Sequence, residues 1–339
     1  MRIDLSVIVC CYNSASRLDS TLRHLASQQL GGVLAEIILV DNNSSDQTAA
    51  VAVSIWQQLG TPFPLCVISE KKPGLSYARK AGIAAARADI ILFCDDDNWL
   101  SQQYVAAAHR QMMEDPQLMI LGGVGEAVCE SEKPFWFDQY KLDYAVGEPA
   151  VRQFGKLQVQ CAYGAGMVVR RDFFRDLDRL GFQSLLTDRK GDLLTGGGDI
   201  EYCLVGILLG KKIRVSSQLS FKHFIPTNRL QFQYLERLFY GQGYSLVLVD
   251  VYRHFLVHTD LPGDRGPFPL WLDHLLFHAK KISVKMVVSQ FKKTQPAYIH
   301  HWITSRQLSG RMAALLDLKS DYKKAFIQVK QFLYKANAI

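Results

Sequence analysis

The sequence lacks the patterns that mark disulfide-stapled, metal-clustered or membrane-spanning chains. Its seven cysteines are an odd number among 339 residues, and no Cys-x-x-Cys pair occurs. Several lie inside apolar runs, which predicts buried reduced thiols rather than a disulfide framework or a zinc site. No apolar run approaches the roughly 20 residues that span a bilayer. The first residues lead straight into a strand pattern without a visible signal peptide, so we expect a cytoplasmic protein.

A Gly-x-Gly-x-x-Gly turn after the first strand is also missing, which argues against a dinucleotide-binding dehydrogenase. The chain is 48% hydrophobic and 21% charged, so it can bury a core. Its formal net charge of +7 favours anionic partners such as nucleotides, phospholipid surfaces or nucleic acid, without choosing among them.

Strand and helix patterns alternate through the first hundred residues. Apolar runs at 5–11, 36–40, 65–69 and 90–94 are separated by helical patterns at 16–29, 47–59 and 75–87. This spacing predicts an α/β fold with a doubly wound, mostly parallel sheet flanked by helices. The carboxyl ends of such strands meet at the edge where open α/β sheets bind ligands.

The triplet Asp95-Asp96-Asp97 follows the fourth of these runs. Carboxylates cannot be buried unpaired, because desolvating each one costs several kcal/mol. Either they hold Mg²⁺ or Mn²⁺ together with a nucleotide's phosphates, or they form a solvated turn in which Asp97 or Asn98 caps the next helix. The triplet by itself leaves both readings open.

The remainder of the chain divides near residue 228. Before that point we expect a helix at 102–114, strands at 118–128 and 158–170, an aromatic loop at 133–144, and a mobile Gly-rich segment at 186–198. We therefore expect one domain at 1–227 and a helical C-terminal region at 228–339. Basic and aromatic residues interleaved along 268–293 suit an anionic membrane surface, a helical packing domain or a homo-oligomer interface, and these alternatives stay open.

Five short motifs in a fixed order resemble those of the family 2 glycosyltransferases, which have the GT-A fold. They span residues 6–13, 39–46, 74–79, 93–97 and 198–201, within a match of about 4–230. The resemblance implies an inverting, metal-dependent transfer from a nucleotide-sugar, most commonly a UDP-sugar, to a hydroxyl of a glycan or lipid-linked acceptor. It also implies Mn²⁺ or Mg²⁺ as cofactor, a role in surface polysaccharide or glycoconjugate biosynthesis, peripheral contact with the inner membrane face, and no nucleic-acid partner.

The resemblance also implies donor and metal contacts. Asp41 would read the base or ribose, although it could instead cap a helix. Asp97 would ligate the metal, while Asp95 would contact the ribose or act through water. His223 would be a further metal ligand, a diphosphate contact or a structural residue. The donor-binding set that follows is Tyr12, Asn13, Asp41, Arg79, Asp95, Asp96 and Arg229, in which Asp96 has no separate role and Arg79 could be a surface charge.

On the acceptor side, the resemblance makes Asp199 the general base. The usual acidic partner is replaced by Gly198, and Asp199 could instead be an ordinary helix N-cap. Glu201 would then bind the acceptor or serve as the base. The aromatic rings of Trp136 and Tyr163 would stack on acceptor sugars, or close a core.

Two rival functions remain. Gly198 keeps open a catalytically inactive carbohydrate- or nucleotide-binding partner of a transferase. A sugar nucleotidyltransferase is the second rival, although its usual Gly-rich, basic loop after the first strand is replaced here by Tyr12-Asn13-Ser14.

Overall fold

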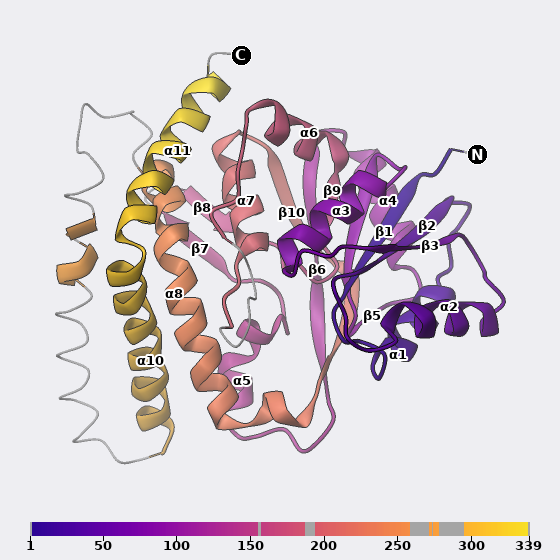
Figure 1. Ribbon diagram of the computed structural model, residues 1–339, viewed down its shortest axis with the longest axis horizontal. Coiled ribbons are helices and arrows are strands. Elements are labelled where there is room, and N and C mark those ends of the chain that lie inside the picture. Colours follow the sequence, from indigo (N-terminus) through magenta and orange to yellow (C-terminus); the bar gives the residue numbers. More distant parts are fainter. Residues whose placement is uncertain are drawn as a thin grey trace.

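The computed structural model describes residues 2–154, 157–186, 194–257, 271–272, 274–277 and 295–337. Its centre is an eight-stranded sheet with helices on both faces (Figure 1). In sheet order the strands are β3 (Leu65–Ser69), β2 (Ala35–Asp41), β1 (Leu5–Cys11), β4 (Ile90–Asp95), β9 (Val168–Arg170), β6 (Leu118–Cys129), β10 (Lys212–Ile225) and β5 (Asn98–Leu100).

Most strands of this sheet run in one direction. β1 pairs parallel with β2 and β4, β2 with β3, and β6 with β10. β9 lies antiparallel between β4 and β6, so β6 again follows the direction of β4. Within the sheet, only β9 and β5 are reversed. The predicted mostly parallel, doubly wound sheet is confirmed.

Alternate residues of the strands supply two cores. Leu5, Val7 and Val9 of β1 pack with α1 (Leu18–Ala26), α2 (Thr48–Gln58) and α4 (Tyr104–Glu114) on one face. Ile8 points to the other face, where α3 (Leu75–Ala85), α6 (Arg171–Arg179) and α7 (Gly198–Leu208) lie. A strand whose alternate residues are apolar on both sides is what a sheet covered on two faces requires.

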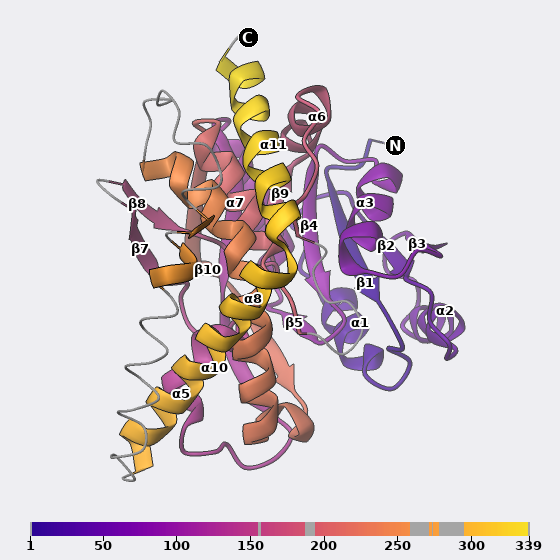
Figure 2. The same cartoon turned by 60° about the vertical axis from the view of Figure 1, so that its left-hand side comes forward.

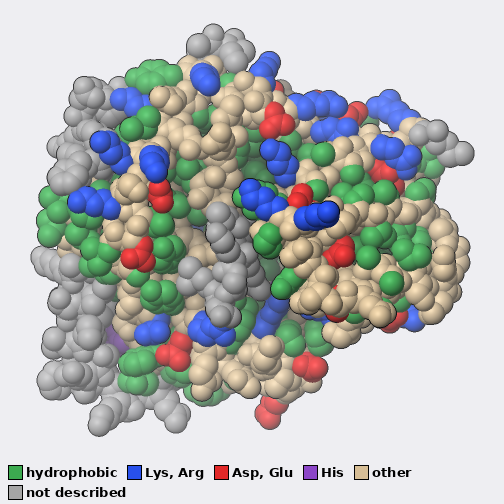
Figure 3. Space-filling model, viewed as in Figure 1, with side chains coloured by type: hydrophobic (Ala, Val, Ile, Leu, Met, Phe, Trp, Pro, Cys, Tyr) green, Lys and Arg blue, Asp and Glu red, His purple; other side chains and the backbone are tan. Residues whose placement is uncertain are grey.

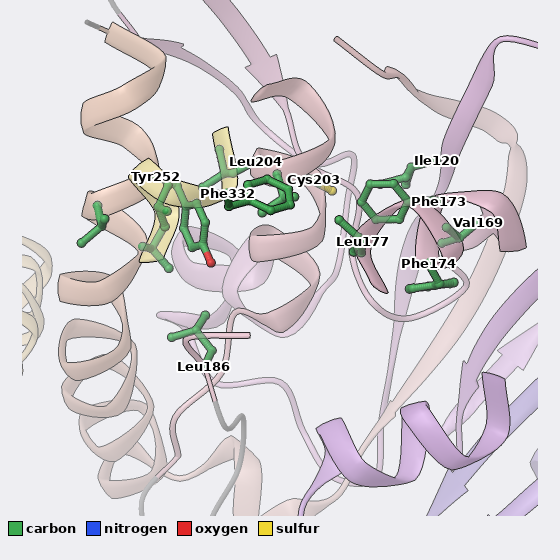
Figure 4. Packing of buried hydrophobic residues seen from close by; sticks show 14 of the residues in the cluster. Ile120, Val169, Phe173, Phe174, Leu177, Leu186, Cys203, Leu204, Tyr252 and Phe332 are labelled. Carbon is green, nitrogen blue, oxygen red and sulfur yellow. The ribbon is translucent and has the colours of Figure 1, made fainter. Parts of the chain in front are cut away.

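The C-terminal helices continue the second core. α8 (Phe232–Val257) packs against α7, α10 (Gln295–Asp317) and α11 (Lys319–Asn337) (Figures 1 and 2). Tyr252 of α8, Phe332 of α11 and Leu204 of α7 belong to one cluster (Figure 4). The boundary at 227/228 stays a prediction, and helices beyond it share a core with α7. Residues 268–293, for which basic aromatic helices were predicted, lie largely outside the described residues.

Glycines allow α8 and α10 to approach closely. A Cβ on Gly243 would lie 2.0 Å from the Gln307 carbonyl oxygen, and a Cβ on Gly310 would lie 2.0 Å from that of Tyr240. Both distances are far below a van der Waals contact, so only glycine fits at either position. Among the described residues, no helix is both long and apolar enough to cross a membrane.

Some local predictions were wrong. The segment 133–144, predicted as loop, contains α5 (Phe137–Tyr140) and the 3₁₀ helix η1 (Lys141–Tyr144), because Phe137, Tyr140 and Tyr144 are buried against α8. The single strand expected at 158–170 is divided into β8 (Leu157–Gln160) and β9. The sequence pattern also missed β7 (Val151–Phe154), which forms a hairpin with β8.

Candidate active site

The carboxyl ends of neighbouring strands bring the predicted donor residues to one edge. Cys11 of β1 is in register with Asp41 of β2, and Cys10 with Asp95 of β4. β10 runs in the same direction and carries His223 near its end. The next turn, η2 (Thr227–Leu230), holds Arg229. This convergence is what the predicted topology required.

The loop after β1 is tied to the loop after β2. Asn13 adopts a left-handed backbone with φ 49°, which asparagine tolerates better than most residues. Its N–H donates to Ser44 Oγ at 3.0 Å, and its Oδ1 accepts from the N–H of Ser45 at 2.8 Å. Tyr12 is 58% exposed beside it. Asn13 thus shapes the loop, and its predicted donor contact stays a prediction.

Asp41 closes the turn that follows β2. Its Oδ1 accepts from the N–H of Ser44 at 3.2 Å. Helix α2 begins later, at Thr48, whose N–H donates to Asp46 Oδ1 at 3.0 Å. The helix-cap alternative for Asp41 is therefore wrong. Its half-buried carboxylate lies at the carboxyl end of β2, and its predicted contact with the nucleoside stays a prediction.

Asn42, which the sequence reasoning missed, organises the loop that leads into α3. Its Nδ2 donates to the carbonyl oxygens of Glu70 at 3.1 Å and Lys72 at 2.7 Å, while its Oδ1 accepts from Gly74 N–H at 2.8 Å. A buried amide that satisfies three backbone groups fixes the start of α3. It therefore also fixes Arg79 one turn further on.

Arg79 is a buried residue, and the alternative of a surface charge is wrong. It is 6% exposed, and its guanidinium carbon lies 5.5 Å from the centre of the Phe93 ring. Its positive charge acts on Asp95. A buried guanidinium at this edge of the sheet suits a site that receives phosphates.

The acidic triplet is mostly buried, so it is not a solvated turn. Asp96 and Asp97 are 8% and 5% exposed. Burial, and then the charges of Asp97 and Asp96, raise the pKa of Asp95 to about 6, although Arg79 opposes this shift. The charge of Asp97 raises the pKa of both Asp95 and Asp96, and a bound cation would relieve this repulsion.

Asp96 has hydrogen-bond partners on the loop after β1 and on α1. Its Oδ2 accepts from Arg17 Nη2 at 2.7 Å and from the Ser14 hydroxyl. Its carbonyl oxygen accepts from Thr21 Oγ1 at 2.9 Å. Asp96 therefore joins the triplet to the loop after β1, and Arg17, missed by the sequence reasoning, is its counter-ion. A donor contact for Asp96 stays a prediction.

Asp97 faces His223 and Arg229. Its Oδ2 accepts from Arg229 Nη1 at 2.9 Å and lies 3.6 Å from His223 Nε2. Burial raises the pKa of Asp97, but His223, Arg229 and Arg17 outweigh burial and hold that pKa well below its usual range. His223 Nδ1 lies 2.6 Å from the Tyr144 carbonyl oxygen. Donation to this carbonyl would hold the ring with Nε2 toward Asp97.

This pair fits a hard divalent cation whose remaining ligands come from the donor. Among the described residues, no three His, Cys, Asp or Glu side chains are grouped closely enough to hold a metal alone. Mg²⁺ and similar ions, however, often take one or two protein ligands together with substrate phosphates and water. Asp97 and His223 Nε2 would be those protein ligands, with Asp95 acting through water.

Asp199 lies in the first turn of α7, beside Arg79. Its Oδ2 accepts from the N–H of Gly164 at 2.8 Å. A Cβ on Gly164 would lie 2.7 Å from Arg79 Nη2 and 3.5 Å from Asp199 Oδ2. Gly164 therefore lies against both side chains, and a larger residue there would collide with Arg79. Helix α7 is preceded by Gly197, with φ 113°, so Asp199 is not its N-cap. The structure thus brings the predicted base next to the donor side.

The structure corrects the prediction for Glu201. Glu201 is 0% exposed. Its carboxylate accepts from Leu185 N–H at 2.6 Å, from Tyr252 Oη at 2.6 Å and from the Ser184 hydroxyl. A carboxylate enclosed in this way cannot reach an acceptor. Glu201 is neither a base nor an acceptor contact.

The two aromatic predictions have different outcomes. Trp136 is 5% exposed and packs against Phe137 and Phe232, so the predicted stacking on an acceptor sugar is wrong. Tyr163 is half-buried, and among the described residues its hydroxyl has no hydrogen-bond partner. Burial, followed by the charges of Asp143 and Asp199, raises the pKa of Tyr163. The contribution of Asp199 shows that Tyr163 lies near the predicted base. An acceptor contact for Tyr163 stays a prediction.

The fold and this site define a GT-A glycosyltransferase: a mostly parallel sheet whose carboxyl edge carries an acidic triplet, with a further carboxylate on the helix opposite. The chain belongs to glycosyl transferase family 2, whose family model matches residues 6–178.

Curated relatives match over shorter stretches. The chain is 27% identical over 194 residues to the uncharacterized glycosyltransferase YfnE of Bacillus subtilis (strain 168). The aligned stretch covers 56% of this chain and 48% of YfnE. It is 34% identical over 99 residues to dolichyl-phosphate beta-glucosyltransferase of Homo sapiens, covering 27% of this chain and 31% of that protein. The chain thus spans about half or less of these relatives.

Solved structures share the fold at low sequence identity. The mannosyltransferase PcManGT from Pyrobaculum calidifontis, in complex with GDP-Man and Mn²⁺, superposes with a TM-score of 0.59 at 18% identity. That match covers 94% of this chain and 88% of PcManGT. GalNAc-T7 with UDP, GalNAc and Mn²⁺ superposes with a TM-score of 0.50 at 16% identity, covering 77% and 52% of the two chains.

Proposed function

We propose that this glycosyltransferase is an inverting, metal-dependent enzyme. It would move a sugar from a nucleotide-sugar, most commonly a UDP-sugar, to a hydroxyl of a glycan or lipid-linked acceptor in surface polysaccharide or glycoconjugate biosynthesis. The observation that carries the proposal is the placement of Asp199 beside Arg79, across Gly164, with Asp95 and Asp97 on the donor side.

The reaction is a single in-line displacement. Asp199 accepts the proton of the acceptor hydroxyl while that oxygen bonds to the anomeric carbon, and the bond from this carbon to the diphosphate breaks on the opposite face. General-base assistance of this kind contributes roughly 10²- to 10⁴-fold. The Asp199 carboxylate keeps its position because the N–H groups of Gly164 and Ile200 donate to its two oxygens, each at 2.8 Å.

On the donor side, Asp41 would hold the nucleoside, with Tyr12 and Asn13 beside it. Asp97 and His223 would hold Mn²⁺ or Mg²⁺, which supplies Lewis-acid stabilisation of the departing diphosphate when bound. Arg79 and Arg229 would contact the diphosphate. Arg229 already pairs with Asp97 at 2.9 Å, so it is placed next to the position that the leaving group would take.

The C-terminal helix supports a further proposal, peripheral contact with an anionic membrane surface at the inner face. Along α11, Lys319, Lys323, Ile327, Lys330 and Tyr334 recur every three or four residues and form one stripe, the α11 stripe, whose members are exposed or half-exposed. On the face drawn in Figure 3, Lys and Arg side chains lie over this region among hydrophobic ones, as they do elsewhere on the face. Cationic side chains interleaved with Ile and Tyr suit a lipid headgroup layer.

The decisive experiment is a screen of nucleotide-sugars for thermal stabilisation, followed by product analysis, with Mn²⁺ present. The expected result is stabilisation by one nucleotide class and transfer of its sugar to an added acceptor. Stabilisation without transfer or donor hydrolysis would favour a binding partner without catalysis. Release of pyrophosphate from a nucleoside triphosphate and a sugar phosphate would establish a nucleotidyltransferase instead.

A further inference from the structure

The carboxylate of Glu201 joins three separate parts of the chain. Glu201 lies on α7, two residues after Asp199, and its own N–H donates to the Gly197 carbonyl at 2.7 Å. Its Oε1 accepts from Leu185 N–H and from Tyr252 Oη, each at 2.6 Å, and its Oε2 accepts from the Ser184 hydroxyl. The connected parts are therefore α7, the chain after α6, and the long helix α8.

Burial makes these contacts strong restraints on position. Glu201 is 0% exposed and Tyr252 is 1% exposed, so neither can exchange its partner for water. A buried carboxylate that loses a donor keeps the full cost of its desolvation. Burial, together with the Glu201 charge, raises the pKa of Tyr252 well above its usual value, so this hydroxyl stays protonated as a donor. Figure 4 shows Tyr252 between α8 and α7, beside Leu204.

Other contacts from α8 hold the segment just before α7. Ser245 Oγ accepts from Gly196 N–H at 3.2 Å. A Cβ on Gly241 would lie 2.3 Å from the Leu194 carbonyl oxygen, so α8 touches that backbone directly. The helix that carries Asp199 is thus fixed to α8 on both sides of its first turn.

We propose that Glu201 is a positioning residue for transfer: through Tyr252 and Ser184 it sets where the first turn of α7 places Asp199. This inference rests on the proposed role of Asp199. It assigns to α8 a share in the geometry of the reaction, although α8 lies beyond the motif-bearing part of the chain. A displacement of about 1 Å at a reacting group can cost 10²-fold in rate.

The test compares two buried tyrosines of the same hydrophobic cluster. Tyr252→Phe removes the hydroxyl that binds Glu201 and keeps the ring. Tyr322→Phe is the matched control, because Tyr322 is also 1% exposed but its hydroxyl lies 3.4 Å from His274 Nδ1, a different partner from Glu201. Both variants should lower the melting temperature by a few degrees. Tyr252→Phe alone should lower kcat about tenfold, with the KM for donor changed less than twofold.

Equal losses of kcat in the two variants, or full kcat in Tyr252→Phe, would overturn the positioning role. Glu201→Gln should lower kcat further than Tyr252→Phe in any preparation that folds. An arm without catalysis uses hydrogen exchange of peptides covering 194–208, in which Tyr252→Phe should exchange at least tenfold faster than Tyr322→Phe. Equal exchange would reject the positioning role even if Asp199 were the base. If Asp199→Asn retained turnover, Asp199 would not be the general base. The exchange rates would then still decide whether the contact between Tyr252 and Glu201 holds the first turn of α7.

Discussion

Asp97 and Arg229 are held together at the carboxyl edge of the sheet, with Oδ2 and Nη1 2.9 Å apart and both groups largely buried. The guanidinium thus lies where a divalent cation would compete for the same carboxylate. In a donor complex the same arginine would be released toward the diphosphate. Arg229 would therefore oppose the metal before the donor binds and assist the leaving group afterwards.

Arg229→Ala should tighten the binding of Mn²⁺ alone by about tenfold, because the carboxylate loses a charged hydrogen bond of about 1–3 kcal/mol. The same variant should weaken the binding of UDP in the presence of Mn²⁺. Titration calorimetry measures both. Lys222→Ala removes an exposed cation from the same strand as a control and should leave both affinities within twofold. Unchanged Mn²⁺ affinity in Arg229→Ala would show that the pair does not compete with the metal.

UDP affinity should rise at least tenfold when Mn²⁺ or Mg²⁺ is added, because the ion would bridge Asp97 and the diphosphate. Asp97→Asn should remove most of this increase. Asp96→Asn is the contrasting variant: it breaks the contact with Arg17 at 2.7 Å, so it should lower the melting temperature and retain the response to metal. UDP binding that is the same with either ion and with chelator would exclude the metal role.

Asp199→Asn should lower kcat by roughly 10²- to 10⁴-fold, because the amide cannot accept the acceptor proton. UDP affinity should stay within about twofold, since the substitution acts on the chemical step and not on the donor. Single-turnover transfer and calorimetry measure the two quantities. Normal turnover would assign the base to a different residue, and the burial of Glu201 excludes it as the replacement.

Stability should depend on pH through Glu36, far from the site. Burial raises the pKa of Glu36, but the Ser6 hydroxyl and Arg87 outweigh it and lower that pKa. A lowered folded-state pKa adds stability above the unfolded value of about 4.3, and this stability is lost as pH falls through the folded value. Glu36→Gln should therefore lower the free energy of unfolding by about 1–3 kcal/mol at pH 7.

In acid the difference between wild type and Glu36→Gln should shrink, because both side chains are then neutral. Urea unfolding at pH 7 and near pH 3 provides the comparison. Glu114→Gln is the control, since its contact with Arg110 is exposed and 3.8 Å long, and such pairs contribute about 0–1 kcal/mol. An equal loss from Glu36→Gln at both pH values would contradict the linkage.

Membrane contact through the α11 stripe should be electrostatic. Each lysine near an anionic surface contributes about 1 kcal/mol, so Lys323→Glu with Lys330→Glu should weaken binding to phosphatidylserine vesicles by at least about tenfold. High salt should have a similar effect on the wild type. The control pair, Lys80→Glu with Lys133→Glu, makes the same charge change on α3 and on the loop before α5. Binding unaffected by the α11 substitutions would remove this surface as the contact.

Much of the donor side could be predicted because its signals are local. Apolar strands ending in Asp41 and Asp95 fix both the sheet and its ligand edge, since parallel neighbours deliver their ends to one side. Which carboxylate faces which partner could not be predicted. Asp96 turns to Arg17 and Asp97 to Arg229, contacts between residues 79 and 132 positions apart that no local pattern encodes.

The acceptor side was harder for the same reason. Glu201 occupies a position in α7 where a second acid looked functional, yet Tyr252, 51 residues later, encloses it. Trp136 lies in a segment that looked like an open aromatic loop, and only its packing on α8 shows it to be core. Asn42 is a missed residue with a usable signal, because an asparagine directly after a strand-ending aspartate commonly forms turn contacts.

The glycine contacts between α8 and α10 have a consequence for recombining family members. At Gly243 and Gly310 each helix backbone rests on the other, so neither helix can be exchanged for one with a side chain at that place. A chimera that borrows a different C-terminal half must therefore take α8 and α10 as one unit. The borrowed α8 must also carry a hydroxyl at the position of Tyr252 to donate to Glu201, or Glu201 must be replaced in the same chimera.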